Sequence, residues 1–356
     1  MRSTLVVASI LLTLIGLELG CRLWRSHYLL WHWPNLVTQE HENLSRFIWG
    51  RFVRDPLLGW APKPDFRSPD LNYNEQGTRI MPALAADVTG SSVLLTTGDS
   101  YAEGGEVADD ESWPAYLQPL VRHRTVNAGV GGYGLDQMVL RAEQQAATLY
   151  PAAIVLSFIA DDLWRTEMRR LWGSEKPYFT AADDGTLVLR NVPVPAIPTP
   201  DDRLSFWHRI LGWSALAEMV LHRLDWHDEW TSDNRRVLPA GTGERLACPL
   251  MRRLATLGIP TLVVAQYDPI ADHDEQRRKS GLVLGCAALS GLAVLDTFDI
   301  VRSAVRERGI GALYLEEHHN AAGNRLVATA IAAELERRGM LQLVGDGSRQ
   351  SPGFPK

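Results

Sequence analysis

The segment VLLTTGDSYAEGGEV, residues 93–107, changes character at Gly98. The residues before this glycine are apolar or β-branched, as in a buried strand, and Asp99 and Ser100 follow it directly. A buried strand, a tight glycine turn and the start of a helix are the means by which α/β proteins hold a reactive group at the carboxyl edge of a sheet. The segment therefore predicts a hydroxyl group at the ligand-binding edge of an α/β fold.

This strand is the first of five short β-rich runs, and segments of helical character alternate with them. Apolar strands that are separated by helices predict a parallel sheet with helices on both faces. The expected strands are 92–97, 124–129, 152–159, 260–267 and 292–297, and the expected helices include 134–149, 244–257, 276–290 and 321–338.

The alternation of strands and helices does not account for a stretch from about 164 to 240. It is rich in Trp, and its Asp-Asp-Gly sequence predicts the turn of a β-hairpin, with a helix over 205–225 further along. An insertion beside the carboxyl edge of the sheet could form a lid or a wall of the substrate site. Its Trp residues could equally serve only a small core of their own, and the sequence leaves both interpretations open.

The composition limits the kinds of partner. Of the 356 residues, 46% are hydrophobic and 22% are charged, which is typical of a globular chain that can bury a large core. The net charge of −6 offers no basic surface to a phosphate backbone, so no nucleic-acid partner is expected. Soluble or neutral substrates fit this charge better.

The N-terminal segment STLVVASILLTLIGL, residues 3–17, is uncharged and strongly apolar. About 20 residues are needed to cross the hydrocarbon of a bilayer, so a spanning helix would continue past Glu18 and Arg22, which are four residues apart and can pair. A cleaved signal peptide is the alternative, but no A-x-A-like cleavage site follows. We therefore predict a membrane anchor, although the balanced positive charges on its two sides do not fix its orientation.

The sequence thus divides into four expected parts. They are a membrane anchor over 1–25, a juxtamembrane extension over 26–90, an α/β domain over 91–340 that contains the insertion, and a flexible tail over 341–356.

The three cysteines show no metal-ligand spacing. Cys248 and Cys286 lie far apart in the sequence and are expected to be buried free thiols, although an exported domain could oxidise them. The adjacent His318 and His319 have no nearby Cys or helix-spaced His that would complete a zinc site. Neither a metal nor another cofactor is expected.

Three further loops carry chemistry at expected strand ends or before an expected helix. Residues 127–137, NAGVGGYGLDQ, form a glycine-rich loop in which backbone amides can approach a ligand closely. Residues 157–165, SFIADDLWR, contain two adjacent Asp residues, and residues 314–328, YLEEHHNAAGNRLVA, contain two Glu and two His residues. Together with Ser100 these loops offer the hydroxyl, the base, the acid and the oxyanion donors of nucleophilic acyl chemistry.

On these motifs the chain resembles the SGNH, or GDSL-type, hydrolase superfamily, and in particular its membrane-anchored bacterial members. The resemblance covers roughly residues 72–340, and NEQGTRI (74–80) and GEVADDESWP (105–114) are similar to segments that flank the GDS motif in anchored members. It implies a three-layer α/β/α sandwich with a flavodoxin-like parallel sheet. It also implies a catalytic domain outside the cytoplasm.

The resemblance implies a role for each motif. Ser100 matches the nucleophile, and its amide and that of Gly132 match donors of the oxyanion hole. Asp161 stands where the family has the oxyanion Asn, and an ionised carboxylate cannot donate a hydrogen bond. Asp161 is therefore protonated, or the hole works through the two amides, or activity is reduced.

The last motif leaves the base ambiguous. Glu316 replaces the usual Asp as the acid, and counting back from Asn320 and Gly323 selects His318 as the base. A three-residue spacing from the acid selects His319 instead. We favour His318, with Glu316 as the acid in either case, and expect the other His to be a solvated residue at the start of a helix.

The sequence therefore predicts a serine esterase that hydrolyses carboxylic esters, such as O-acetyl or short O-acyl groups of a small molecule or glycan, through an acyl-enzyme on Ser100. Two alternatives stay open, namely an O-acyltransferase of surface polysaccharide that uses the same site and a non-catalytic glycan-binding or scaffold protein. A classical α/β-hydrolase is disfavoured because no G-x-S-x-G sequence is present.

Overall fold

A computed structural model describes residues 2–84, 92–182, 185–196, 202–224, 226–269 and 273–341. The expected tail therefore lies outside the described residues, except for its first residue. The chain forms two compact units. Unit 1 comprises Met1–Trp60, Met168–Lys176 and Asn191–Val237, and unit 2 comprises Ala61–Glu167, Pro177–Arg190 and Leu238–Lys356.

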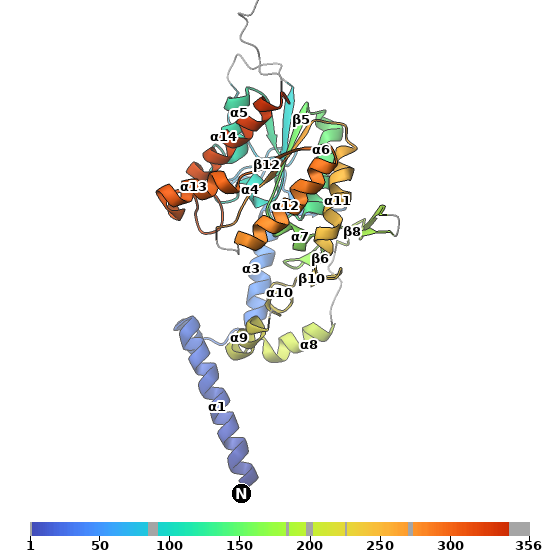
Figure 1. Cartoon of the computed structure of the whole chain (residues 1–356). Coiled ribbons are helices and arrows are strands. Elements are labelled where there is room, and N and C mark those ends of the chain that lie inside the picture. The colour runs from blue at the N-terminus through green and yellow to red at the C-terminus, as the bar shows by residue number, and fades with distance from the viewer. Residues whose placement is uncertain are drawn as a thin grey trace, which may run out of the picture. The chain divides into compact units, whose positions relative to one another are not determined.

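Unit 2 is built on a five-stranded parallel sheet (Figure 1). Its order, β12-β11-β5-β3-β4, is the flavodoxin-like order, in which the direction of winding reverses between the first strand and the third, here β3 and β5. The expectation of a parallel flavodoxin-like sheet is confirmed. The strands are β3 (Val93–Thr97), β4 (Arg124–Asn127), β5 (Ala153–Phe158), β11 (Thr261–Ala265) and β12 (Ala293–Asp296).

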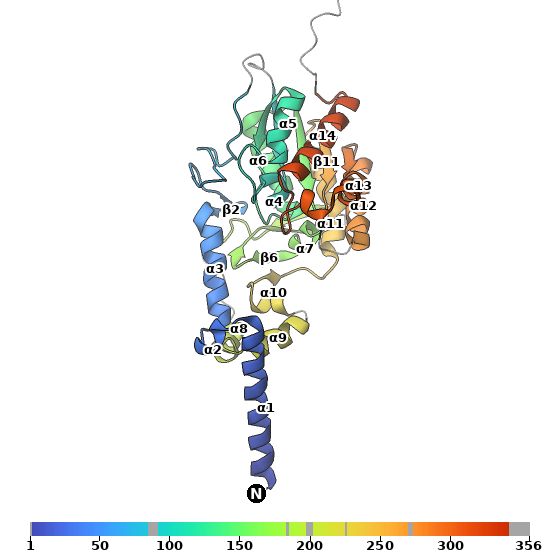
Figure 2. The same cartoon turned by 90° about the vertical axis from the view of Figure 1, so that its left-hand side faces the viewer.

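Helices cover both faces of this sheet, as the alternating pattern predicts (Figures 1 and 2). The long helices α5, α13 and α14 share one apolar cluster with residues of the strands, whereas α6, α11 and α12 pack together on the other side. Strands that are buried on both faces explain the continuous apolar runs in the sequence. The helices are α5 (Trp113–Val121), α6 (Leu135–Leu149), α11 (Thr242–Ala255), α12 (His273–Leu289), α13 (Phe298–Arg308) and α14 (Ala321–Arg337).

Short elements complete unit 2. The expected hairpin is confirmed as an antiparallel pair of strands, and two one-turn helices begin at the carboxyl ends of β3 and β5. These elements are β8 (Tyr178–Ala181), β9 (Leu187–Arg190), α4 (Ser100–Glu103), α7 (Asp162–Arg165) and the 3₁₀ helix η2 (Ile310–Ala312), while β2 (Gly59–Pro62) crosses the boundary between the units.

Unit 1 is assembled from three separate stretches of chain, so the expected juxtamembrane extension and most of the expected insertion contribute to it. The Trp residues of the insertion therefore share a unit with the N-terminal helices, except for Trp164, which lies in unit 2. Its elements are α1 (Arg2–Arg25), α2 (Tyr28–Trp31), α3 (Leu36–Arg51), β1 (Phe52–Asp55), β6 (Met168–Leu171), β7 (Ser174–Glu175), α8 (Asp202–Leu211), α9 (Ala215–Arg223), α10 (His227–Trp230) and β10 (Arg235–Arg236).

The expected single helix over 205–225 is wrong, because the structure has two helices, α8 and α9, in its place. A Cβ on Gly212 would lie 2.3 Å from the carbonyl oxygen of His208 and 2.5 Å from Oδ1 of Asn35. Ser214 then caps α9, since its side chain accepts a hydrogen bond from the amide of Ala217. A helical period alone could not reveal this break.

Helix α1 is long and apolar enough over Ser3–Arg25 to cross a membrane. The expected pair is present, because Nε of Arg22 lies 2.6 Å from Oε1 of Glu18. The helix is therefore a candidate membrane span, and a signal sequence would have the same length and composition.

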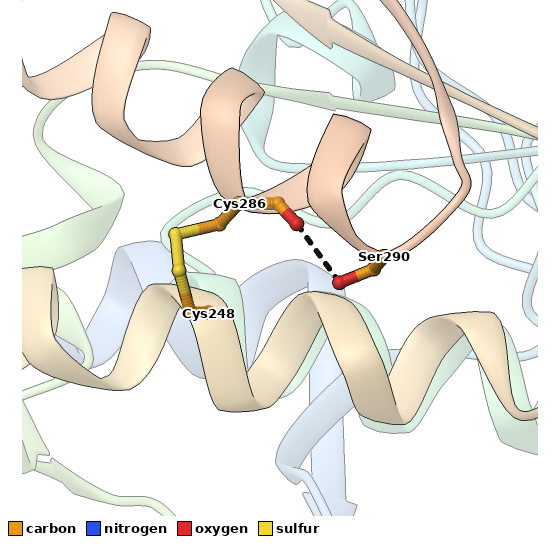
Figure 3. Close-up of a disulfide and its surroundings, with 3 residues drawn as sticks. All are labelled: Cys248, Cys286 and Ser290. Carbon is orange, nitrogen blue, oxygen red and sulfur yellow. Dashed lines mark hydrogen bonds between the residues drawn. A yellow bond between two sulfur atoms is a disulfide. The ribbon is translucent and has the colours of Figure 1, made fainter.

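The expectation of free thiols at Cys248 and Cys286 is wrong, because the two residues form a disulfide (Figure 3). Helices α11 and α12 pack side by side and bring the two Cα atoms to 4.6 Å, although 38 residues separate them in the sequence. Beside the bond, the hydroxyl of Ser290 donates to the carbonyl of Cys286 at 2.8 Å. Cys21 is free and buried, as expected.

Candidate active site

Ser100 lies where β3 ends and α4 begins, at the carboxyl edge of the sheet. Gly98 makes this turn possible, because it has a φ of 158° and a Cβ there would lie 2.4 Å from the carbonyl oxygen of Ser157. Asp99 caps α4, and its Oδ1 accepts the amide of Tyr101 at 2.9 Å. The turn and the cap together hold the Ser100 side chain at the edge.

His318 reaches Ser100 from a tight loop near the other end of the chain. The carbonyl of His318 accepts the amide of Leu315 at 2.9 Å, and a β-bridge joins Tyr314 to His319. Asn320 then caps α14. This loop brings Nε2 of His318 to 2.8 Å from Oγ of Ser100, although 218 residues separate them.

The carboxylate that contacts His318 is Glu106 and not Glu316, which was the expected partner. Oε1 of Glu106 lies 2.8 Å from Nδ1 of His318. Glu316 is exposed and forms no hydrogen bond or ion pair within the described residues. A carboxylate can only accept, so Nδ1 carries the proton and Nε2 is free to accept the hydrogen of the Ser100 hydroxyl.

Arg79 holds the segment on which Glu106 lies. Its guanidinium is buried and donates to the carbonyls of Glu103 at 2.5 Å, of Val107 at 2.6 Å and of Gly104. Its Nε donates to Oδ1 of Asp109 at 2.9 Å. These contacts join the segments 74–80 and 105–114, which the sequence analysis noted only as flanking segments. The similarity of these two segments to members of the family was the only feature of the sequence that pointed to Glu106.

Tyr101 connects the turn of Ser100 to the loop that carries His318. Its hydroxyl donates to the carbonyl of Glu317 at 2.5 Å, and its ring centroid lies 5.0 Å from that of His318. Burial raises the pKa of this hydroxyl well above its usual value, so it stays a donor. No motif in the sequence pointed to this contact.

His319 is buried rather than solvated, which corrects the expectation for the second histidine. Its ring packs against Tyr314 with the ring centroids 4.4 Å apart, and against the edge of Tyr101 at 5.5 Å. Burial lowers the pKa of His319 to about 3. A neutral, enclosed imidazole of this kind is part of the core.

Gly132 lies in the glycine-rich loop between β4 and α6, with a φ of 79° that favours glycine. Gly129 lets this loop approach α4, because a Cβ there would lie 2.4 Å from the amide nitrogen of Glu103. Asn127 fixes the start of the loop, since its side chain donates to the carbonyl of Ala102 and accepts the amide of Gly129. The loop is therefore tied to the backbone that follows Ser100.

Asp161 lies directly before α7, at the end of β5, which is the neighbour of β3 in the sheet. Its side chain makes no capping hydrogen bond to the helix. The next residue, Asp162, is buried and accepts from Nη1 of Arg165 at 2.8 Å and from the amide of Ile159. The helix therefore does not use the carboxylate of Asp161, whereas the carboxylate of Asp162 binds Arg165 and the backbone.

A cluster of buried charged side chains lies beside the turn that carries Ser100. Nη1 of Arg165 lies 3.8 Å from Oδ2 of Asp99 as well as beside Asp162. Burial raises the pKa of Asp162 well above its usual value, and the neighbouring charge of Asp99 adds to this shift. Burial also raises the pKa of Asp99, although Arg165 and His318 oppose it.

A pocket of about 250 Å³ opens at the carboxyl ends of β11 and β12. The hydroxyl of Tyr314, on its wall, donates to the carbonyl of Tyr267 at 2.8 Å, and the Tyr314 ring packs on His319. The pocket therefore adjoins the loop that carries the base. Its lining includes the aromatic rings of Tyr267, Phe298 and Tyr314 and the cationic or ionisable side chains of His273, Arg302 and Arg306.

Neither a family model nor a curated protein matches this chain. Similar solved structures include a lipolytic protein of the G-D-S-L family from Desulfitobacterium hafniense, at 12% identity and a TM-score of 0.39, over 69% of this chain and 100% of that chain. A catalytic mutant of an acetylxylan esterase from Geobacillus stearothermophilus has 14% identity and a TM-score of 0.44, over 72% and 99% of the two chains.

The motifs on which the resemblance rests keep their order in this fold. The GDS motif follows the first strand of a flavodoxin-like sheet, and the glycine-rich, Asp-Asp and His-bearing loops follow in the order expected of the superfamily. Ser100 and His318, the first and last of these motifs, meet within hydrogen-bond distance. The sequence motifs, the strand order and this contact agree with the resemblance of the chain to the SGNH hydrolase superfamily.

Proposed function

We propose that the protein is a serine esterase that hydrolyses carboxylic esters, such as O-acetyl or short O-acyl groups, through an acyl-enzyme on Ser100. The observation that carries the proposal is the hydrogen-bonded series Ser100, His318 and Glu106, with 2.8 Å at each step. A hydroxyl, an imidazole and a carboxylate in this order are the arrangement that activates a serine nucleophile.

In the proposed reaction, Oγ of Ser100 attacks the ester carbonyl while Nε2 of His318 takes its proton. The amides of Ser100 and Gly132 donate to the oxygen that becomes negative. The alcohol leaves with the proton from Nε2, and the acyl group stays on Oγ. Water then attacks the acyl carbonyl while Nε2 of His318 takes its proton, and this proton passes to Oγ of Ser100 as the acid leaves. Glu106 holds the Nδ1 proton and stabilises the imidazolium in both halves of the reaction.

The pocket beside Tyr314 is the proposed site for part of the substrate. Aromatic walls suit the C–H faces of a sugar or a short acyl chain, and Arg302 and Arg306 at the rim suit a negative charge. An acylated acidic glycan fits both features. The replacement Arg302→Gln is expected to raise KM for an acidic substrate and to leave kcat and the KM for a neutral ester unchanged.

The disulfide supports a location of unit 2 outside the cytoplasm, with α1 as the proposed membrane anchor. Disulfides persist in oxidising compartments and are rare in the cytosol. Alkylation of intact cells with a maleimide before and after reduction tests this proposal. Reactivity of Cys248 and Cys286 without reduction would contradict it.

A fluorophosphonate probe and a panel of esters test the activity of the purified full-length protein. We expect the probe to label the parent and the control variant Ser303→Ala, which changes an exposed hydroxyl on α13, and not to label Ser100→Ala. Loss of hydrolysis by a thousandfold or more in Ser100→Ala is the expected size for a nucleophile. Turnover that requires a sugar acceptor would favour the acyltransferase, and a lack of labelling would favour the non-catalytic protein.

A further inference from the structure

One face of α1 carries both its charged pair and part of its apolar surface. Residues that are three or four positions apart lie on one face of a helix. On α1 this face comprises Leu11, Leu14, Ile15, Glu18 and Arg22. Glu18 and Arg22 are largely buried within unit 1, whereas Leu11 and Ile15 are 54% and 55% exposed. The face therefore changes from a protein contact to an open surface within about two turns.

The contact at Glu18 ties α1 firmly to α9. The carboxylate of Glu18 accepts the amides of Ala215 and Leu216 at 2.9 and 3.0 Å, and the hydroxyl of Ser214 at 2.7 Å. It thus satisfies backbone donors at the start of α9, which a helix cannot satisfy internally. A free tether would not need such bonds.

Arg22 secures the same joint from the next turn of α1. Its guanidinium donates to the carbonyls of Leu29 at 3.0 Å, of His32 at 3.3 Å and of Trp213, and it lies 3.6 Å from the centre of the Trp33 ring. Both views show α8 and α9 at the C-terminal end of α1 (Figures 1 and 2). The position of α8 and α9 along α1 is therefore fixed by the fold of unit 1.

An apolar groove of about 640 Å³ lies between α1 and the pair α8 and α9. Its walls on the α8 and α9 side include large side chains that stay about half exposed, at 52% for Ile210, 49% for Trp213 and 46% for Val220. Further exposed apolar residues are Phe206, Trp207 and Leu211 on α8, and Leu224 and Trp226 just after α9. Apolar surface of this extent on a folded unit marks a binding surface.

The position of the groove along α1 indicates which kind of molecule occupies it. Leu11, Leu14 and Ile15 lie 3–7 residues before Glu18, which is about 5–10 Å further into the membrane at 1.5 Å per residue. The apolar surface of α8 and α9 thus continues the surface by which α1 would meet lipid. Trp207, Trp213 and Trp226 are of the residue type that gathers at the border between lipid and water.

We propose that α8 and α9 form a second membrane element, which lies in the outer part of one leaflet and lines, with α1, a groove for lipid acyl chains. This proposal rests on the membrane anchoring by α1 under the proposed function. The protein then contacts the bilayer over a broad area and in a fixed orientation. A helix with an apolar surface and a polar remainder binds in this way without spanning.

The test uses the full-length protein in nanodiscs that contain one copy each, with a bimane label on a single introduced cysteine in a Cys21→Ser background. The labelled variants are Val220→Cys at the groove, His222→Cys on another side of the same helix, and Leu11→Cys within α1. Doxyl groups on the acyl chains and iodide in the water serve as the two quenchers.

We expect acyl-chain doxyl to quench the label at Val220→Cys and Leu11→Cys at least threefold more than at His222→Cys, with the reverse order for iodide. Quenching by doxyl at Leu11→Cys but iodide quenching at Val220→Cys would overturn the second element and leave the anchor intact. A label at Val220→Cys that neither quencher reaches would show that protein covers the groove, which also overturns the proposal. If doxyl fails at Leu11→Cys as well, the anchor itself is wrong.

Discussion

Oε1 of Glu106 and Nδ1 of His318 lie 2.8 Å apart, although 212 residues separate them in the chain. The carboxylate that contacts His318 thus comes from the segment just after Ser100 rather than from the loop that carries His318. Its side chain is 41% exposed, and that of His318 is 20% exposed, so the pair lies at the surface of the site. Glu106 can therefore both orient the imidazole and lie beside the positive charge that forms on it.

The replacement Glu106→Gln is expected to lower kcat by about a hundredfold or more, because the amide no longer stabilises the imidazolium that forms in the transition state. Glu316→Gln is the matched control and should keep parent activity. Steady-state kinetics on one ester substrate provides the comparison. If the two variants exchange these outcomes, the acid is Glu316 after all.

Arg79 is expected to act on catalysis through the position of Glu106. Arg79→Lys keeps the charge but loses the fork that binds four carbonyls and Asp109, so kcat should fall by tenfold or more at saturating substrate. The decisive check is a double variant with Glu106→Gln. If Arg79 acts through Glu106, Arg79→Lys should cost much less activity in the Glu106→Gln background than in the parent, whereas equal losses would refute this dependence.

His319 should make the stability of the protein depend on pH. Its folded pKa of about 3 lies below the unfolded value of 6.5, so the unfolded chain binds a proton that the folded chain does not. The contribution of the neutral imidazole is present above pH 6.5 and is lost as the pH falls toward 3, by up to about 1.4 kcal/mol per pH unit. Urea unfolding of the parent and of His319→Gln between pH 7 and 5 should give a shallower slope for the variant, and equal slopes would contradict the burial.

Asp161→Asn is expected to raise the esterase rate if the carboxylate faces the oxyanion, because an ionised Asp opposes the charge of the transition state. A donor at such a position contributes about 3 kcal/mol in acyl transfer. The gain should be largest at high pH. Rate profiles against pH for the parent and the variant give the comparison, and a loss at every pH would remove Asp161 from the oxyanion hole.

The disulfide should contribute mainly to stability. By the chain-entropy relation, a loop closed over 38 residues is worth about 4 kcal/mol. The pair of replacements Cys248→Ser and Cys286→Ser should lower the free energy of unfolding by roughly this amount, with kcat unchanged at a temperature where the variant stays folded. Chemical denaturation of parent and variant measures the difference, and a change in kcat at equal folding would link the bond to the site.

The sequence by itself determined the parallel sheet of unit 2 and the chemistry of its edge. The strands β3, β5 and β11 are buried on both faces, so their apolar runs can be recognised in the sequence without knowledge of the neighbouring segments. Gly98 and Ser100 also act locally, because a glycine turn between a strand and a helix is a property of adjacent residues. The pairing of Glu18 with Arg22 is likewise decided by helical spacing.

Only the tertiary structure decided which distant groups meet. The choice of Glu106, the burial of His319 and the bond between Cys248 and Cys286 all depend on how loops and helices pack, and no local pattern encodes that packing. The break between α8 and α9 follows from the close approach of Gly212 to Asn35, which lies 177 residues earlier. Local preferences thus specify elements and turns, whereas contacts between distant segments specify the partners of each functional side chain.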